Sequence, residues 1–135
     1  MKFIDFPTPK GLTVTVNTDQ VCQIFHDRSL TDAPALLDFA SGEPQGVTDS
    51  VADAGKRLGI PLAELEGFSP TGTQIGTVLV VPAQVTFVRE TEPGRPDAGS
   101  LVHLGNGRTR AVTQSRKDAV DRIMAAAAAT KDADT

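Results

Sequence analysis

The pattern of apolar and polar positions predicts two pairs of strands, one pair in each half of the chain. β-Branched and aromatic residues are concentrated in four short runs, at 14–16, 20–25, 78–81 and 84–88. Turn-forming residues separate the two runs of each pair: Asn17-Thr18-Asp19 and Pro82-Ala83. Each pair therefore predicts two strands that meet at a tight corner.

A third strand and a hairpin follow in each half. We expect strands at 36–39 and 101–104, followed by Ser41-Gly42 and by Asn106-Gly107. Asn-Gly is the strongest short hairpin signal, because both residues tolerate the positive φ angles of a type I′ turn. The arms of this hairpin are expected to include Leu101, Val102, Ala111 and Val112.

Each half ends in a predicted helix. Ser50 and Ser115 each stand three residues before an aspartate, a spacing that resembles a capping box at a helix start. The apolar residues that follow lie on one helical face: Val51, Ala54 and Leu58 in the first half, and Ala119, Ile123 and Ala127 in the second. Between the halves, Pro61 is placed to start a helical turn and Gly67 to end it.

The two halves also share residue identities. Residues 35–58 aligned with 100–123, at an offset of 65, are identical at Leu36/Leu101, Gly42/Gly107, Val47/Val112, Thr48/Thr113, Ser50/Ser115, Asp53/Asp118, Ala54/Ala119 and Arg57/Arg122. Chance would give about one or two identities over this length. At an offset of 64, residues 14–24 match 78–88 at Val14/Val78, Val16/Val80, Gln20/Gln84 and Val21/Val85. We interpret this self-similarity as an internal duplication.

The duplication sets the predicted architecture. We expect an α+β fold of two tandem β-rich repeats, each closed by one short helix. One repeat of about sixty residues buries too little surface to be stable alone, so the two would pack as an intramolecular pseudo-dimer sharing one core. The predicted organisation is a single domain over 1–124, with repeat one at 1–60, repeat two at 61–124, and a fraying Ala-rich helical tail at 125–135.

Composition narrows the classes of function. The 135 residues are 39% hydrophobic and carry a net charge of −4, which disfavours a general nucleic-acid binder. The single cysteine, Cys22, excludes an intramolecular disulfide and a multi-cysteine metal site, and it fits a reducing compartment. Neither a signal-peptide pattern nor a membrane-length apolar run is present, so we expect a cytoplasmic protein with no cofactor, no metal and no membrane partner.

Three motifs carry a resemblance to a known family. The stretch from Val16 to Val21, the Asn106-Gly107 hairpin and the stretch from Val112 to Val120 resemble the strand, hairpin and helix-start motifs of the small FlbD-like flagellar and swarming-motility proteins. Those proteins are single units of about half this length, so the resemblance covers each half separately. It implies a motility-related role and supplies no catalytic residues.

Candidate chemistry is sparse. The two histidines, His26 and His103, lack the spacing of a metal site. Asp38 aligns with His103, so the duplication would place a carboxylate and an imidazole symmetrically at the repeat junction. A solvated strand face is the alternative interpretation of both positions.

The two halves differ most in charge after the hairpin. Four basic residues, Arg108, Arg110, Arg116 and Lys117, lie in a segment without acidic residues, where the first half has Glu43, Gln45, Val51 and Ala52. The first turn of a helix is already electropositive, so cations there indicate an anionic partner. A solvated run of charge is the alternative.

These observations favour a non-enzymatic binding or assembly component. It would act through exposed strand edges and the basic hairpin, with another copy or an acidic protein as partner, in a motility-related or a phage or virion structural role. The alternative is a small regulatory nucleic-acid-binding module that uses residues 107–117. An enzyme at the repeat junction, around Asp38 and His103, is the least favoured interpretation.

Overall fold

The protein is an α+β fold, as the sequence predicts. The computed structural model describes residues 2–27, 32–69, 72–91 and 99–133. The elements of the first half are β1 (Phe3–Pro7), β2 (Thr13–Asn17), the 3₁₀ turn η1 (Thr18–Gln20), β3 (Val21–Phe25), β4 (Ala35–Phe39), β5 (Gln45–Val47) and α1 (Val51–Leu58). Those of the second half are β6 (Ala63–Phe68), β7 (Gln74–Val80), η2 (Pro82–Gln84), β8 (Val85–Glu90), β9 (Ser100–Leu104), β10 (Thr109–Val112) and α2 (Arg116–Ala133).

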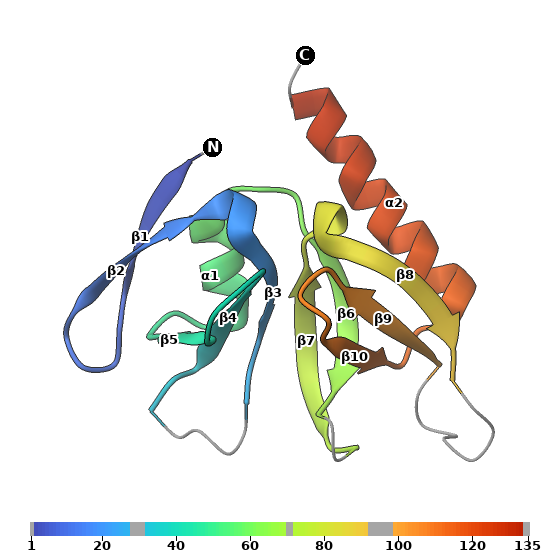
Figure 1. The fold of residues 1–135 in the computed structure, drawn as a ribbon, viewed down its shortest axis with the longest axis horizontal. Helices are drawn as coiled ribbons and strands as arrows, with labels where there is room; N and C mark the ends of the chain where they lie inside the picture. The colour runs from blue at the N-terminus through green and yellow to red at the C-terminus, as the bar shows by residue number, and fades with distance from the viewer. Residues whose placement is uncertain (1, 28–31, 70–71, 92–98, 134–135) are drawn as a thin grey trace.

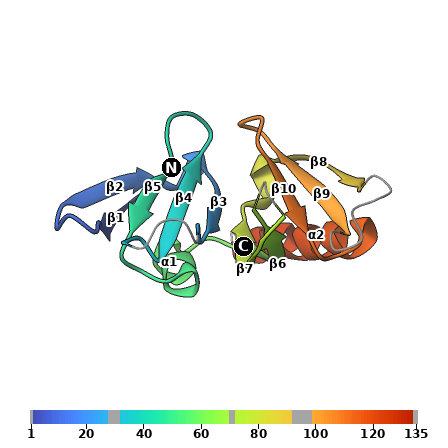
Figure 2. The same cartoon turned by 90° about the horizontal axis from the view of Figure 1, so that it is seen from below.

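One antiparallel sheet runs through both halves. Its strand order is β5-β4-β3-β7-β6-β10-β9-β8, while β1 and β2 form a separate hairpin. The halves join where β3 pairs with β7, with Gln23 opposite Val80 and Ile24 opposite Leu79. The β1–β2 hairpin lies at one end of the molecule, and β8 with α2 lies at the other (Figures 1 and 2).

The segment between the halves is a strand, and the prediction of a helical turn there is wrong. β6 begins at Ala63, and its side chains alternate between the core and solvent. Leu65 is buried between the exposed Glu64 and Glu66, which is the period-2 pattern of a half-buried strand. Gly67 allows close strand packing, because a Cβ built there would lie 2.4 Å from Cγ2 of Val78.

The tight corners and the hairpins occur where they are predicted, but one turn differs in type. η1 and η2 form the corners, and the Asn17 side chain accepts a hydrogen bond from the Asp19 N–H. The hairpin between β9 and β10 is not type I′, because only Gly107 has a positive φ, at 84°. Leu104 N–H donates to the Arg108 carbonyl around a three-residue loop, so Asn106 keeps an ordinary backbone and uses its side chain.

The helices begin at the predicted caps. Ser50 Oγ accepts from the Asp53 N–H, and Ser115 Oγ accepts from the Asp118 N–H, each at 3.2 Å. The predicted core faces are confirmed for Ala54 and Leu58 in α1 and for Ala119 and Ile123 in α2, all of them buried. α2 continues to Ala133, so most of the Ala-rich tail belongs to this helix; residues 134–135 lie outside the described residues.

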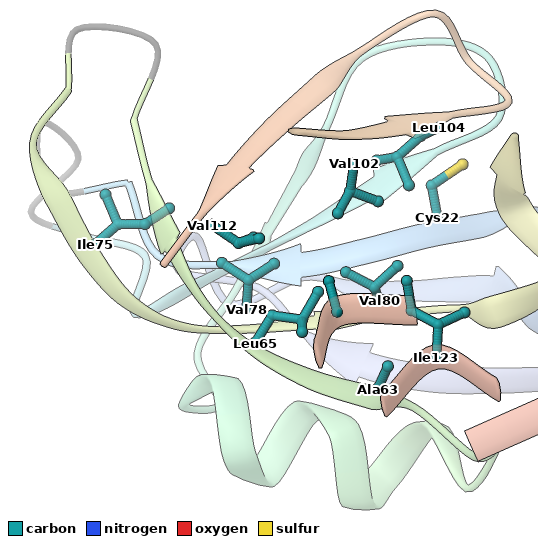
Figure 3. Close-up of a cluster of buried hydrophobic side chains, with 11 residues drawn as sticks. Cys22, Ala63, Leu65, Ile75, Val78, Val80, Val102, Leu104, Val112 and Ile123 are labelled. Atoms are coloured by element: carbon teal, nitrogen blue, oxygen red, sulfur yellow. The ribbon is translucent and has the colours of Figure 1, made fainter. Parts of the chain in front are cut away.

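The buried apolar side chains form two large clusters, where the sequence led us to expect one core. Figure 3 shows the second-half cluster, which consists of Cys22, Ala63, Leu65, Ile75, Val78, Val80, Val102, Leu104, Val112, Ala119 and Ile123. The first-half cluster consists of Phe6, Val16, Val21, Ile24, Ala35, Leu37, Val47, Ala54, Leu58 and Val81. Each cluster thus includes one residue from the other half, Cys22 and Val81, on either side of the β3–β7 contact.

Strand registers agree between the halves. At the offsets of 64 and 65, Gln23 opposite Asp38 corresponds to Phe87 opposite His103, and both pairs follow a bulge. We call residues related in this way matched. In the first strand of each half, Phe6 pairs with Val14 and Leu65 pairs with Val78, so β1 and β6 are matched as well.

Candidate functional site

The contact between the halves contains a buried polar network, which we call the junction; it consists of Gln23, Asp38, Asn106, Arg108 and Arg110. Arg110, on β10, is only 6% exposed. Its Nε donates to Oε1 of Gln23 at 3.0 Å, and its Nη1 donates to the carbonyl of Phe68 at 2.9 Å. Its guanidinium lies over the ring of Phe25, 4.4 Å from the centroid. Burial lowers the pKa of Arg110 to about 10, partly offset by Asp38, so the group is charged at neutral pH.

Asp38 supplies the negative charge of the junction. This β4 residue is fully buried, and its Oδ2 accepts from Nε2 of Gln23 and Nδ2 of Asn106, each at 2.9 Å. Arg108 Nη1 lies 2.9 Å from Oδ1 without hydrogen-bond alignment, so that contact is an ion pair only. Because Asn106 and Arg108 come from the β9–β10 turn, these contacts hold the hairpin of the second half against β4 of the first half.

His103 has a different set of partners. On β9, its ring stacks on Phe87, with centroids 4.0 Å apart and planes 16° apart. Its Nε2 accepts from Nε of Arg89 at 3.4 Å, and its Nδ1 lies 3.2 Å from Oγ1 of Thr109. His103 and Asp38 are not bonded to each other, and the bonds of Asp38 are all made within the junction. The structure therefore does not assemble them as an acid–base pair.

The four predicted partner-binding cations divide into two groups. Arg110 is buried, which corrects the expectation that it lies on a binding surface, and Arg108 is half exposed while paired with Asp38. Arg116 and Lys117, in the first turn of α2, are exposed, and Arg116 Nε lies 3.6 Å from Oε1 of Glu90. The hairpin charges are thus used within the chain, and the two helix charges face solvent.

Cys22 lies next to the junction, and its chemistry is restrained. It is fully buried, and burial, assisted by the charge of Asp38, raises the pKa of its thiol. Less of the nucleophilic thiolate is therefore present at neutral pH than in a free cysteine. Within residues 2–27, 32–69, 72–91 and 99–133, no three of His, Cys, Asp and Glu gather where they would hold a metal ion. In the same part of the chain, no helix is long and apolar enough to cross a membrane.

Two strand edges form a second candidate site. In the described sheets, β2 pairs only with β1, and β8 pairs only with β9. Among the described residues the large exposed apolar side chains are Phe3, Leu12, Phe87 and Met124. Phe3 lies on β1 and Leu12 directly precedes β2, whose own exposed residues are threonines, so apolar surface adjoins the β2 edge. On β8 the exposed Phe87 lies in the edge strand itself. The sequence contained one signal of this: Phe87 occupies the position matched to Gln23.

Comparisons of the chain with protein-family models, with curated proteins and with solved structures gave no match. The function must therefore be inferred from the two candidate sites, the junction and the strand edges. The junction holds its charges in mutual contacts, with Asp38 and Arg110 buried and Arg108 half exposed, an arrangement that stabilises the contact between the halves. The edges of β2 and β8 offer backbone donors and acceptors to another strand.

Proposed function

We propose that the protein is a non-enzymatic binding or assembly component that acts through the edges of β2 and β8. The observation that carries this proposal is that, among the described strands, β2 and β8 each pair on one side only and have exposed apolar side chains on or beside them, Leu12 next to β2 and Phe87 on β8. Natural proteins usually protect such edges, because another strand can add to them. Phe87, 48% exposed at the centre of β8, is the most direct example.

We also propose that the two halves arose by internal duplication and behave as two related units. The support is the agreement of registers beyond the identities in sequence. For example, Thr48 N–H donates to the Pro7 carbonyl, and its matched residue Thr113 donates to that of Glu66. A shared fold with different surfaces suits a component that contacts neighbours on two sides.

A catalytic role at the junction has less support. Asp38 is fully buried, and its carboxylate is occupied by Gln23, Asn106 and Arg108. A general base needs access to the proton that it removes, and these contacts leave a substrate little access to Asp38.

A regulatory nucleic-acid-binding module remains the second candidate. Its support is the exposed pair Arg116 and Lys117 at the start of α2. It is less favoured because Arg108 and Arg110, the other basic residues of 107–117, already have partners in the first half. A motility-related role and a phage or virion structural role both fall within the assembly proposal.

Hydrogen–deuterium exchange on the protein in its native assembly would test this function. The tagged chain would be isolated from its own cells, and the exchange of β2 and β8 amides compared with that of dilute recombinant protein. We expect both edges to be protected in the native assembly and to exchange quickly in the dilute protein. Equal, fast exchange at both edges in the two samples would overturn the proposal.

A further inference from the structure

The contact between the two halves is asymmetric, because each half contributes a different strand to it. The first half contributes β3 and the second half contributes β7. The strands matched to these are β8 in the second half and β2 in the first, and among the described strands each of them pairs on one side only. β1 and β5 also pair on one side only, but they are bonded to each other's ends, because the Thr48 N–H after β5 donates to the Pro7 carbonyl of β1. In each matched pair of strands, β3 with β8 and β7 with β2, one strand therefore takes part in the contact within the chain and the other lies at a sheet edge.

From this asymmetry we infer that a second copy of this chain docks head to tail, with its β2 paired to β8 of the first copy. The inference rests on the proposed function and identifies the partner at the edges. Internally, Gln23 lies opposite Val80 and Ile24 opposite Leu79. Matched positions place Phe87 opposite the second copy's Val16, and Val88 opposite its Thr15.

The pairing must be between molecules. β2 and β8 lie at opposite ends of the molecule in both views, with the other strands of the eight-stranded sheet between them (Figures 1 and 2). One chain cannot bring its own two edges together without breaking the β3–β7 contact. A head-to-tail contact of this kind is heterologous, so repeated copies form a ring where the rotation closes and a filament where it does not.

Side-chain sizes at the two contacts are exchanged in a complementary way. Where the two halves meet, Leu79 of β7 packs on α1 at Gly55, and a Cβ added to Gly55 would lie 2.5 Å from Cδ1 of Leu79. The matched residues are Thr15 on β2 and Val120 on α2. Within the chain a large strand residue, Leu79, packs on a glycine of the helix. At the proposed contact the small strand residue Thr15 would pack on the larger helix residue Val120, so the two pairs fill a similar space.

Leu62 gives a second example of this correspondence. It packs against the first-half cluster, and its Cδ1 would lie 3.3 Å from a Cβ at Gly55. The registers of β1 and β6 match it to Phe3, which is 59% exposed. Docking would bring Phe3 onto α2 of the neighbouring copy and remove this aromatic ring from solvent.

Polar groups are exchanged as well. At the contact between the halves, the carboxylate of Asp38 on the first half meets the cation Arg108 on the second. Their matched residues are His103 on β9 and Glu43 in the β4–β5 turn, which is exposed. The second contact would therefore place the carboxylate on the other partner, beside the imidazole of His103. A contact between two first halves would instead place Glu43 against Asp38, two carboxylates, so the exchange disfavours that pairing.

Sedimentation velocity of the full chain across a range of concentrations would test the inference. We expect concentration-dependent species larger than the monomer. Phe87→Lys on β8 and Thr15→Lys on β2 should each weaken association by about tenfold or more, because a lysine at the contact would lose its hydration. Gln74→Lys, exposed at the start of β7, is the control and should associate as the parent does. Circular dichroism would establish that each variant is folded.

Two results would overturn the inference. One is a parent protein that remains monomeric at the highest concentration, and the other is association that both lysine variants leave unchanged. In either case, protection of the same edges in the native assembly would still support the proposed function with a different partner. The two proposals can therefore fail separately.

Discussion

β3 and β8 occupy matched places in the two halves, yet one is buried and the other forms an edge. Gln23, in the middle of β3, is 1% exposed, and Phe87 in β8 is 48% exposed. Both strands follow a 3₁₀ corner, carry a bulge and pair with the next strand in the same register. The difference lies in the neighbour: β7 covers β3, and no described strand covers the corresponding side of β8.

The same comparison explains the basic hairpin. Arg110 on β10 corresponds to Gln45 on β5, and Arg108 corresponds to Glu43. The sequence associates this difference in charge with an anionic partner. In the structure, the carboxylate that meets Arg108 is Asp38 of the same chain. Charges that differ between matched positions therefore reflect what each half packs against as much as any external ligand.

The largest expected effect comes from breaking the junction at Arg110. Arg110→Ala would remove the hydrogen bonds to Oε1 of Gln23 and to the Phe68 carbonyl, and the cation over Phe25. We expect a loss of about 4 kcal/mol in the free energy of unfolding, measured by urea denaturation. The matched change Gln45→Ala should cost about 0.5 kcal/mol or less. Equal losses would show that the two positions are energetically alike, contrary to this comparison.

Truncation of the matched aliphatic residues on β3 and β8 should give a smaller difference. Ile24 is fully buried between β4 and β7, so Ile24→Ala should cost about 3 kcal/mol. Val88 is only partly buried, and Val88→Ala should cost about 1 kcal/mol in dilute protein. Thermal and urea unfolding would measure both changes. A Val88 variant as unstable as the Ile24 variant would mean that β8 is covered in the monomer.

Thiol reactivity compares the exposure of the two strands. Cys22 should react with an aromatic disulfide reagent only as the protein unfolds, because it is buried and its pKa is raised. In a Cys22→Ser background, the matched substitution Thr86→Cys places a thiol at an exposed position. This thiol should react with the reagent about as fast as a small model thiol does. Rapid labelling of Cys22 in native protein would contradict the closed junction.

Local patterns in the sequence predict many of the elements. The corners, the strands at β4 and β9, and the helix starts at Ser50 and Ser115 depend on nearby residues, and these predictions are confirmed. The prediction of a helical turn at 61–67 is wrong, because Pro61 and Gly67 resemble helix boundaries although the glutamates between them alternate with apolar residues as in a strand. The sequence does not predict β1, because its FIDFP run is short and only its pairing with β2 makes the strand evident.

The junction could not be predicted in the same way. Arg110 and Gln23 are 87 residues apart, and Asn106 and Asp38 are 68 apart, so no local pattern relates them. The sequence near an arginine does not show whether its side chain is buried or exposed to solvent. Only the β3–β7 pairing, a long-range feature of the sheet, shows that the hairpin faces the first half rather than solvent.

Mixing two singly blocked chains would test head-to-tail docking most directly. Thr15→Lys leaves β8 available and Phe87→Lys leaves β2 available, so we expect each variant alone to remain monomeric. An equimolar mixture should form a one-to-one dimer and nothing larger, which multi-angle light scattering with a mass-tagged variant would detect. A mixture that remains monomeric, or either variant forming a dimer alone, would contradict the pairing of β2 with β8.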